Sequence, residues 1–298
     1  MKIKTLLVLP FLFLYIGCHS QNQVALSSTP LKIEKKANYS TVQPYYQVDF
    51  SAAYCLFEIR VNDVLVFTLN LEGQTSTMVP INSAILQSGK QQIAIKILPL
   101  AGQKTLHPSA QFSYNIKVFD AANHLNFKEQ LPGEYAVEKV DPTKKQSFLA
   151  HTTNFNAEVP YSIAAYQTAT DLGSVGGMKE KLQSAFQQLA KLIAKGDLEQ
   201  IRKLIANREN IAATTMYLSK EESEDRITGM LGNLKSGFKL EPIPENAMLK
   251  IFGNRKLVTL IRPDGSPALL LKNDKVNEEL GLEFTFYIPE GKNNLEII

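Results

Sequence analysis

The feature that most constrains the fold is a change in hydrophobic period partway along the chain. From residue 42 to about 120, short runs rich in branched and aromatic residues alternate apolar with polar positions, as in "CLFEIRV" and "QIAIKILPL". A period of two is typical of strands with one buried face. From Met178 onward, apolar residues recur three and four positions apart, which is typical of amphipathic helices. The change therefore predicts two regions of different architecture.

The first region is predicted to be all-β. Asn62-Asp63 separates two strand-like runs at hairpin spacing, and "INSAILQSGKQQI" places a turn at residues 88–90 before the next run. This pattern resembles the small jelly-roll or immunoglobulin-like sandwiches of extracytoplasmic bacterial proteins, which bind sugars, proteins or nothing at all. Residues 125–163 stay strand-like, and they either complete the sandwich or bridge to the next region.

The second region is predicted to be α+β. Apolar residues from Met178 to Ile193 form one helical stripe, and Gly196-Asp197 ends that helix and opens another. Ser219 and Glu222 have the spacing of a capping box for a third helix, after which the chain returns to strand-like runs. Helices followed by antiparallel strands are similar to the cone-shaped nuclear-transport-factor-like superfamily. The resemblance implies a curved sheet around a pocket, but it assigns no function because the superfamily contains both enzymes and binding proteins.

Together these patterns predict two domains, an N-terminal all-β sandwich followed by a C-terminal α+β domain of helices and a curved antiparallel sheet. With 298 residues and 44% hydrophobic composition, the chain is long enough for each domain to bury its own core. The expected divisions are a signal peptide over 1–17, a lipidated tether over 18–37, a β-sandwich with trailing strands over 38–167, a linker over 168–177 and the α+β domain over 178–298.

The N-terminus has the composition of a signal peptide. A basic start precedes an apolar run from Thr5 to Ile16, which is shorter than the roughly 20 residues that span a bilayer as a helix. The sequence around Gly17 and Cys18 resembles the lipobox of bacterial lipoproteins, although Tyr15 stands where leucine is usual. The resemblance implies cleavage between Gly17 and Cys18, followed by acylation of Cys18 with palmitate-type chains.

A membrane-anchored location in the cell envelope follows from this interpretation. Residues 20–36 are polar and serine-rich, as expected of a tether. Position 19 is His19 and not the aspartate that retains some lipoproteins in the inner membrane, which favours the periplasmic face of the outer membrane. The alternative is an ordinary secretory peptide with an incidental cysteine.

The motifs predict no catalytic residue, cofactor or metal site. The histidines have neither HxxxH nor HxH spacing, and none follows residue 151, although enzymes of the cone-shaped superfamily typically use a His–Asp pair. There is no GxSxG motif, and "GSVGG" lacks the Lys-Ser/Thr of a phosphate-binding loop. A net charge of +3, with lysines scattered among glutamates, does not suggest nucleic acid.

A few side chains remain as binding candidates. Tyr45, Tyr46 and Tyr54 are predicted to form a tentative binding surface; the alternative is that they are alternating core and face residues of one strand. Cys55 opens an apolar run and is predicted to be a buried, inert thiol.

The expected function is that of a non-enzymatic, membrane-anchored envelope lipoprotein that binds a protein or other macromolecule, such as an accessory or immunity-type protein. The alternative is a small-ligand-binding protein or an enzyme that uses the pocket of the C-terminal domain. Two convergent carboxylates or a Tyr–Asp pair in a deep cavity would favour the enzyme, whereas a shallow apolar pocket would favour binding.

Overall fold

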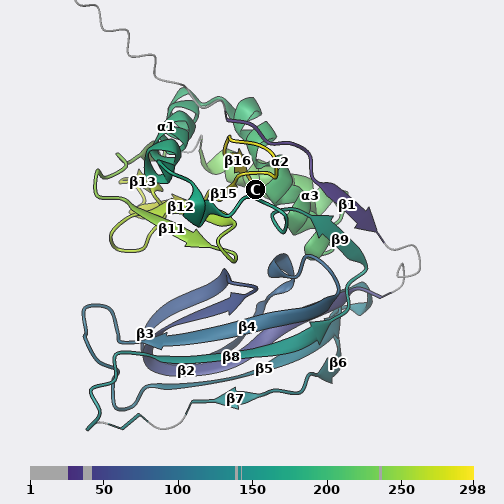
Figure 1. The fold of residues 1–298 in the computed structure, drawn as a ribbon, viewed down its shortest axis with the longest axis vertical. Coiled ribbons are helices and arrows are strands. Elements are labelled where there is room, and N and C mark those ends of the chain that lie inside the picture. Colours follow the sequence, from purple (N-terminus) through teal and green to yellow (C-terminus); the bar gives the residue numbers. More distant parts are fainter. Residues whose placement is uncertain (1–25, 36–41, 138–139, 142, 235–236) are drawn as a thin grey trace, which may run out of the picture.

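A computed structural model describes residues 26–35, 42–137, 140–141, 143–234 and 237–298 (Figure 1). Gly17, Cys18 and the predicted signal peptide lie outside the described residues. The described chain is mostly sheet, and its three helices lie in the C-terminal part after many strands. An N-terminal sheet forms one layer, and the helices and the remaining strands lie over it in Figure 1.

The N-terminal sheet is antiparallel and curled. Its order is β6-β5-β2-β4-β8, with β3 paired to β2 and β7 paired to β5. The strands are β2 (Pro44–Val61), β3 (Val64–Pro80), β4 (Gly89–Leu98), β5 (Gln111–Asp120), β6 (Asn126–Gln130), β7 (Tyr135–Ala136) and β8 (Leu149–Ala157). Because β6, β7 and β8 belong to this sheet, most of the strand-like sequence after residue 125 completes it.

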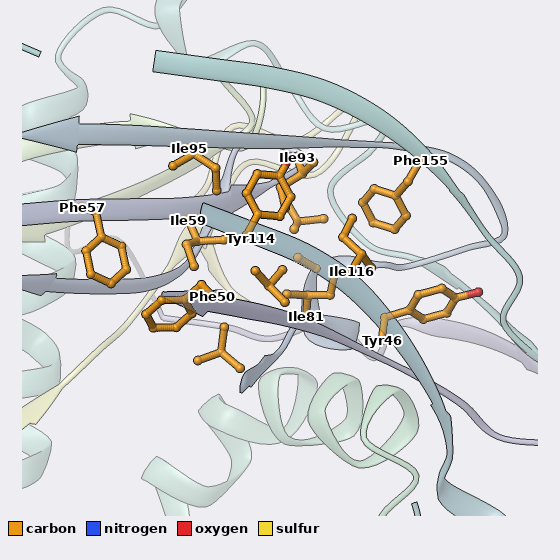
Figure 2. Packing of buried hydrophobic residues seen from close by; sticks show 14 of the residues in the cluster. Tyr46, Phe50, Phe57, Ile59, Ile81, Ile93, Ile95, Tyr114, Ile116 and Phe155 are labelled. Atoms are coloured by element: carbon orange, nitrogen blue, oxygen red, sulfur yellow. The ribbon is translucent and has the colours of Figure 1, made fainter. Parts of the chain in front are cut away.

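A bulge at Tyr54 shapes this sheet. The pairing of β2 with β3 shifts register between Ala53 and Cys55, and Tyr54 has a φ of +48°, in the left-handed region that favours glycine. In a regular strand, residues seven apart face opposite sides, yet Phe50 and Phe57 point into one core with ring centroids 5.1 Å apart (Figure 2). The bulge therefore lets both halves of β2 serve the same core.

The two halves of β2 also have different neighbours. On the side away from β3, β2 pairs with β5 as far as Ala53 and with β4 from Leu56 onward. Alternate residues of these strands are buried, among them Ile93, Ile95 and Ile97 of β4. This period of two is the one that the sequence predicts.

Three helices follow: α1 (Met178–Lys195), α2 (Leu198–Thr215) and α3 (Lys220–Asn233). The predicted caps are confirmed. Asp197 accepts a hydrogen bond from the Gln200 N–H at the start of α2, and Ser219 with Glu222 forms a complete capping box on α3. These contacts satisfy backbone N–H groups that have no partner inside the helix.

The C-terminal strands form two small antiparallel sheets. One has the order β11-β12-β15-β16, and the other has the order β10-β13-β14. Phe186 of α1 lies 5.5 Å from Phe286 of β15, measured between ring centroids, so the helix covers one face of the first sheet. The strands are β10 (Lys239–Leu240), β11 (Met248–Phe252), β12 (Leu257–Ile261), β13 (Leu269–Asn273), β14 (Glu278–Leu282), β15 (Phe286–Tyr287) and β16 (Glu296–Ile297).

Residues 26–35, here called the N-terminal segment, are part of the fold. Strand β1 (Lys32–Lys35) pairs with β9 (Tyr161–Ala164). Thr29 donates from its N–H and its Oγ1 to Glu296, at 3.0 and 2.9 Å, and Asn207 of α2 donates to the Thr29 carbonyl at 2.7 Å. This part of the expected tether is therefore packed against the C-terminal region.

Glu296 is ionised where it binds the N-terminal segment. Its carboxylate is buried and also accepts a hydrogen bond from Lys292 Nζ at 2.7 Å. Burial alone would raise the pKa of Glu296, but the hydrogen bonds from Lys292 and Thr29 outweigh it and hold the pKa below its ordinary range. The stabilisation that ionised Glu296 gives the folded state is therefore fully present above the pKa of an unfolded glutamate. It is lost as the pH falls through the lowered pKa of Glu296 in the folded state.

The predicted linker over 168–177 is packed too. Leu172 is buried, its N–H donates to the Arg255 carbonyl at 2.9 Å, and Asp171 accepts a hydrogen bond from Arg255 Nε at 2.9 Å. A small apolar cluster forms beside it, with Ala169 against Leu257 and Ile298. The segment that follows the N-terminal sheet is thus packed against the C-terminal strands.

Candidate functional site

A cleft of about 560 Å³ lies between β3 and the C-terminal sheet that contains β11 and β12. This volume is within the range of small-molecule sites in proteins. One wall is formed by Val64–Thr68 of β3, and the opposite wall by β11 and β12. Arg208 of α2 and Arg226 of α3 lie along its side, so helices and both sheets contribute to one site.

The edge of β3 forms the first wall. Side chains of a strand alternate between two faces, so a cavity lined by five successive residues runs along the strand edge. Within the described ranges, β3 pairs with β2 alone, which leaves its other edge without a strand partner. Phe67 joins this wall to the core, because its ring lies 5.9 Å from that of Phe57, between centroids.

The second wall is one face of the β11–β12 pair. Lys250 pairs with Thr259 and Phe252 pairs with Leu257, so these side chains share a face, and all four line the cleft. Val258 points the other way and is buried in the core beneath α1. The sheet therefore has α1 on one face and the cleft on the other.

The hairpin turn between β2 and β3 is attached to the turn between β11 and β12. The Asp63 carbonyl accepts a hydrogen bond from Gly253 N–H at 3.2 Å, and its carboxylate accepts one from Asn254 N–H at 2.9 Å. Asn62 and Asp63 both have positive φ, as a two-residue hairpin turn requires, which confirms the predicted hairpin. The two walls are thus held together beside the cleft.

Positive charge prevails in the cleft. The side chains of its lining include three cationic groups, Arg208, Arg226 and Lys250, and one acidic group, Glu283. Glu209 is buried behind the lining and accepts hydrogen bonds from Arg208 Nε and Arg226 Nε, both at 2.8 Å. Arg208 Nη1 also donates to the Glu283 carbonyl at 3.0 Å. With Glu209 included, these side chains still carry a net positive charge.

Lys250 and Arg226 are the donors available to a ligand. Lys250 has no salt bridge or side-chain hydrogen bond among the residues that the structure describes. Arg226 is oriented through its Nε, and about half of its side chain is exposed. A fixed, partly exposed guanidinium is well placed for charge-assisted hydrogen bonds to an anionic group.

Most ionisable side chains of the lining are cationic. It contains serine, threonine and tyrosine hydroxyls and a single acidic side chain, but neither histidine nor cysteine. In the part of the chain that the structure describes, no group of three or more His, Cys, Asp or Glu side chains is placed to hold a metal ion. No described helix is long and apolar enough to cross a bilayer.

The three tyrosines of the predicted binding surface lie apart. Tyr46 is 4% exposed, and its hydroxyl accepts a hydrogen bond from Glu158 N–H at 2.7 Å, so it belongs to the core (Figure 2). Tyr45 faces the other side of β2, and Tyr54, 39% exposed, stacks on His107 at the bulge. The expectation that the three tyrosines form one surface is corrected accordingly. Successive side chains of a strand face opposite sides, which separates Tyr45 from Tyr46, and the bulge changes the direction of the Tyr54 side chain.

Cys55 is buried, as predicted. Burial raises the pKa of its thiol to about 11. A thiol that is both buried and protonated at neutral pH is a poor nucleophile, which agrees with a packing role.

Sequence patterns did not reveal the cleft residues. Arg226 and Lys250 read as ordinary solvated positions of a helix and a strand, and Phe67 as one apolar residue among many. The only local signal is that "VLVFTLNL", residues 64–71, contains neither charge nor proline, although it forms an edge strand. Their convergence depends on contacts between distant parts of the chain.

The chain is a β-rich α+β protein with a cleft where its sheets meet. No family model, curated protein or solved structure matches it. Function is therefore inferred from the cleft itself.

Proposed function

We propose that this protein is a non-enzymatic binding protein of the cell envelope, and that its cleft takes a ligand with an apolar body and an acidic group. The cleft carries the proposal, because it combines apolar walls from β3 and β11–β12 with the cations Arg226 and Lys250. Apolar surface supplies affinity, while a few well-placed polar groups supply orientation. In this proposal the N-terminal sheet and the C-terminal region are two domains, and the ligand binds between them.

The composition of the lining supports binding over catalysis. General acid–base chemistry needs a positioned side chain within reach of the reacting atoms, with a pKa near the working pH. Glu283 is the single acidic side chain of the lining, and the cationic side chains of the cleft suit an anion that is held and not transformed.

A fluorescent anion tests the cleft directly. 8-Anilinonaphthalene-1-sulfonate joins aromatic rings to a sulfonate, and we expect one molecule to bind per chain. Lys250→Glu replaces an attractive charge with a repulsive one, so we expect affinity to fall by about tenfold or more. Titration of the probe fluorescence measures this change.

Lys191→Glu is the matched control. Lys191 is exposed on α1 and lies outside the cleft lining, so the same change in net charge is expected to leave affinity unaltered. Equal affinities for the two variants would contradict binding in the cleft.

Membrane attachment through Cys18 is the second part of the proposal, and it rests on the lipobox resemblance around Gly17 and Cys18. We place the protein on the periplasmic face of the outer membrane. Cells expressing the full chain are expected to incorporate labelled palmitate into it, and Cys18→Ala is expected to abolish the label. Cys55→Ala, the control, is expected to keep it. Label that persists in Cys18→Ala would exclude this anchor.

A further inference from the structure

We infer that the ligand of the cleft is an extended, acidic peptide segment of another protein, which adds a strand to the open edge of β3. This inference rests on the proposed binding function and names the chemistry of the ligand. Three observations support it: the unpaired edge, the lack of charged residues and proline over residues 64–71, and the positive side chains beside it.

The edge of β3 is a template for pairing. β3 runs from Val64 to Pro80 and pairs with β2 along nearly its whole length. Every second residue of such a strand directs its N–H and C=O away from its partner. No other described segment hydrogen-bonds to this edge as a strand. An incoming strand would satisfy these groups, as in other cases of β-strand addition.

Most natural edge strands carry features that prevent such pairing, including lysines, prolines and bulges. Residues 64–71 have neither charge nor proline, although the pairing shifts register opposite Val66 and bends the strand there. Beyond that shift, Phe67–Leu71 pairs regularly with β2. A regular, uncharged edge that starts in the cleft and continues beyond it is suited to a partner strand.

The charge of the cleft defines the side chains of that strand. Lys250 of β11 and Arg226 of α3 line the same cleft as the β3 edge, and Glu283 is the single acidic side chain of that lining. Aspartate or glutamate on the incoming strand would therefore be attracted, and lysine or arginine repelled. Alternate apolar side chains would lie against Phe67 and Phe252, which also line the cleft.

The test uses the full-length protein in detergent and a phage-displayed library of random dodecapeptides, with counter-selection on Lys250→Glu. We expect enriched peptides to alternate β-branched or aromatic residues with acidic ones. The best peptide is then synthesised with N-methyl groups on alternate backbone amides, in the two possible phases. Because strand addition uses the N–H of every second residue, one phase should weaken binding at least about tenfold in fluorescence anisotropy, and the other should leave it nearly unchanged.

The outcomes separate this inference from the proposed function. Peptide binding with no dependence on the methylation phase would overturn strand addition. Strand addition would also be overturned if anilinonaphthalene sulfonate binding depends on Lys250 but no peptide is enriched. In that case the cleft would remain a binding site. A concentration-dependent dimer that excludes the peptide would identify a second copy of this chain as the occupant. Loss of both peptide and fluorescent-probe binding would overturn both proposals.

Discussion

Phe57→Ala is expected to lower the free energy of unfolding by about 3–5 kcal/mol, the usual cost of removing a fully buried aromatic ring. Phe57 has no exposed surface, and its ring lies 5.1 Å from that of Phe50 and 5.0 Å from that of Phe112, between centroids. Truncation removes these contacts and leaves a cavity in a closely packed interior. Urea or guanidinium denaturation, followed by circular dichroism, measures the change.

Two variants make this result interpretable. Phe148 is 54% exposed and lies beneath Lys96, so Phe148→Ala removes the same atoms from the surface and is expected to cost under about 1 kcal/mol. Phe57→Leu keeps most of the buried volume and should recover much of the loss. A similar cost for Phe57→Ala and Phe148→Ala would mean that Phe57 is not at the centre of the core.

Asn82→Ala is expected to destabilise the fold by about 2–4 kcal/mol, although it deletes only a small polar group. Asn82 is fully buried; its Oδ1 accepts from Tyr46 N–H at 2.7 Å, and its Nδ2 donates to the Pro44 carbonyl at 3.0 Å. Alanine leaves the buried Tyr46 N–H without this partner, and an unsatisfied buried donor costs more than the hydrogen bond itself contributes. Chemical denaturation provides the measurement.

A second residue shares this site. Tyr217, which follows α2, donates its hydroxyl to the same Pro44 carbonyl at 3.0 Å. Once Asn82 is removed, Tyr217 becomes the remaining side-chain donor to that carbonyl, so Tyr217→Phe should cost more in the Asn82→Ala background than alone. A double-mutant cycle measures this coupling. Additive effects would contradict the shared site.

Asn70→Ala is the matched control for Asn82→Ala. Asn70 lies on the exposed part of β3 and accepts one hydrogen bond, from Ala101 N–H at 2.9 Å. Water can replace an exposed hydrogen-bond partner, so we expect a cost under about 1 kcal/mol. Equal losses for the two asparagines would show that burial does not determine the cost.

Local patterns in the sequence predicted the local structure well. The period of two placed the strands of the N-terminal sheet, and the period of 3.6 placed the helices after Met178. The Ser219–Glu222 box marked the start of α3, because a helix cap depends on residues only three apart. The order of a β-rich part, then helices, then antiparallel strands was predictable for the same reason.

Features made by distant residues were not predictable. Tyr54 itself is not a glycine, although Gly73 lies opposite it in β3, and the bulge reverses the inward and outward positions of the rest of β2. Thr29 and Glu296 are 267 positions apart, so the packing of the N-terminal segment leaves no periodic trace. The cleft likewise joins Val64–Thr68 to Lys250, and each is unremarkable within its own strand.

The packing of the N-terminal segment would also limit how far the folded body can lie from a membrane in the proposed lipid-anchored form. If lipid is attached at Cys18, only the eight peptide units between Cys18 and Leu26 separate the bilayer from the fold. At up to ~3.5 Å per residue they extend no further than about 28 Å. A tether running to residue 37 would have allowed more than twice this reach. The folded body would therefore stay within about one domain diameter of the lipid surface, and it would meet partners that come to the membrane more readily than those deeper in the periplasm.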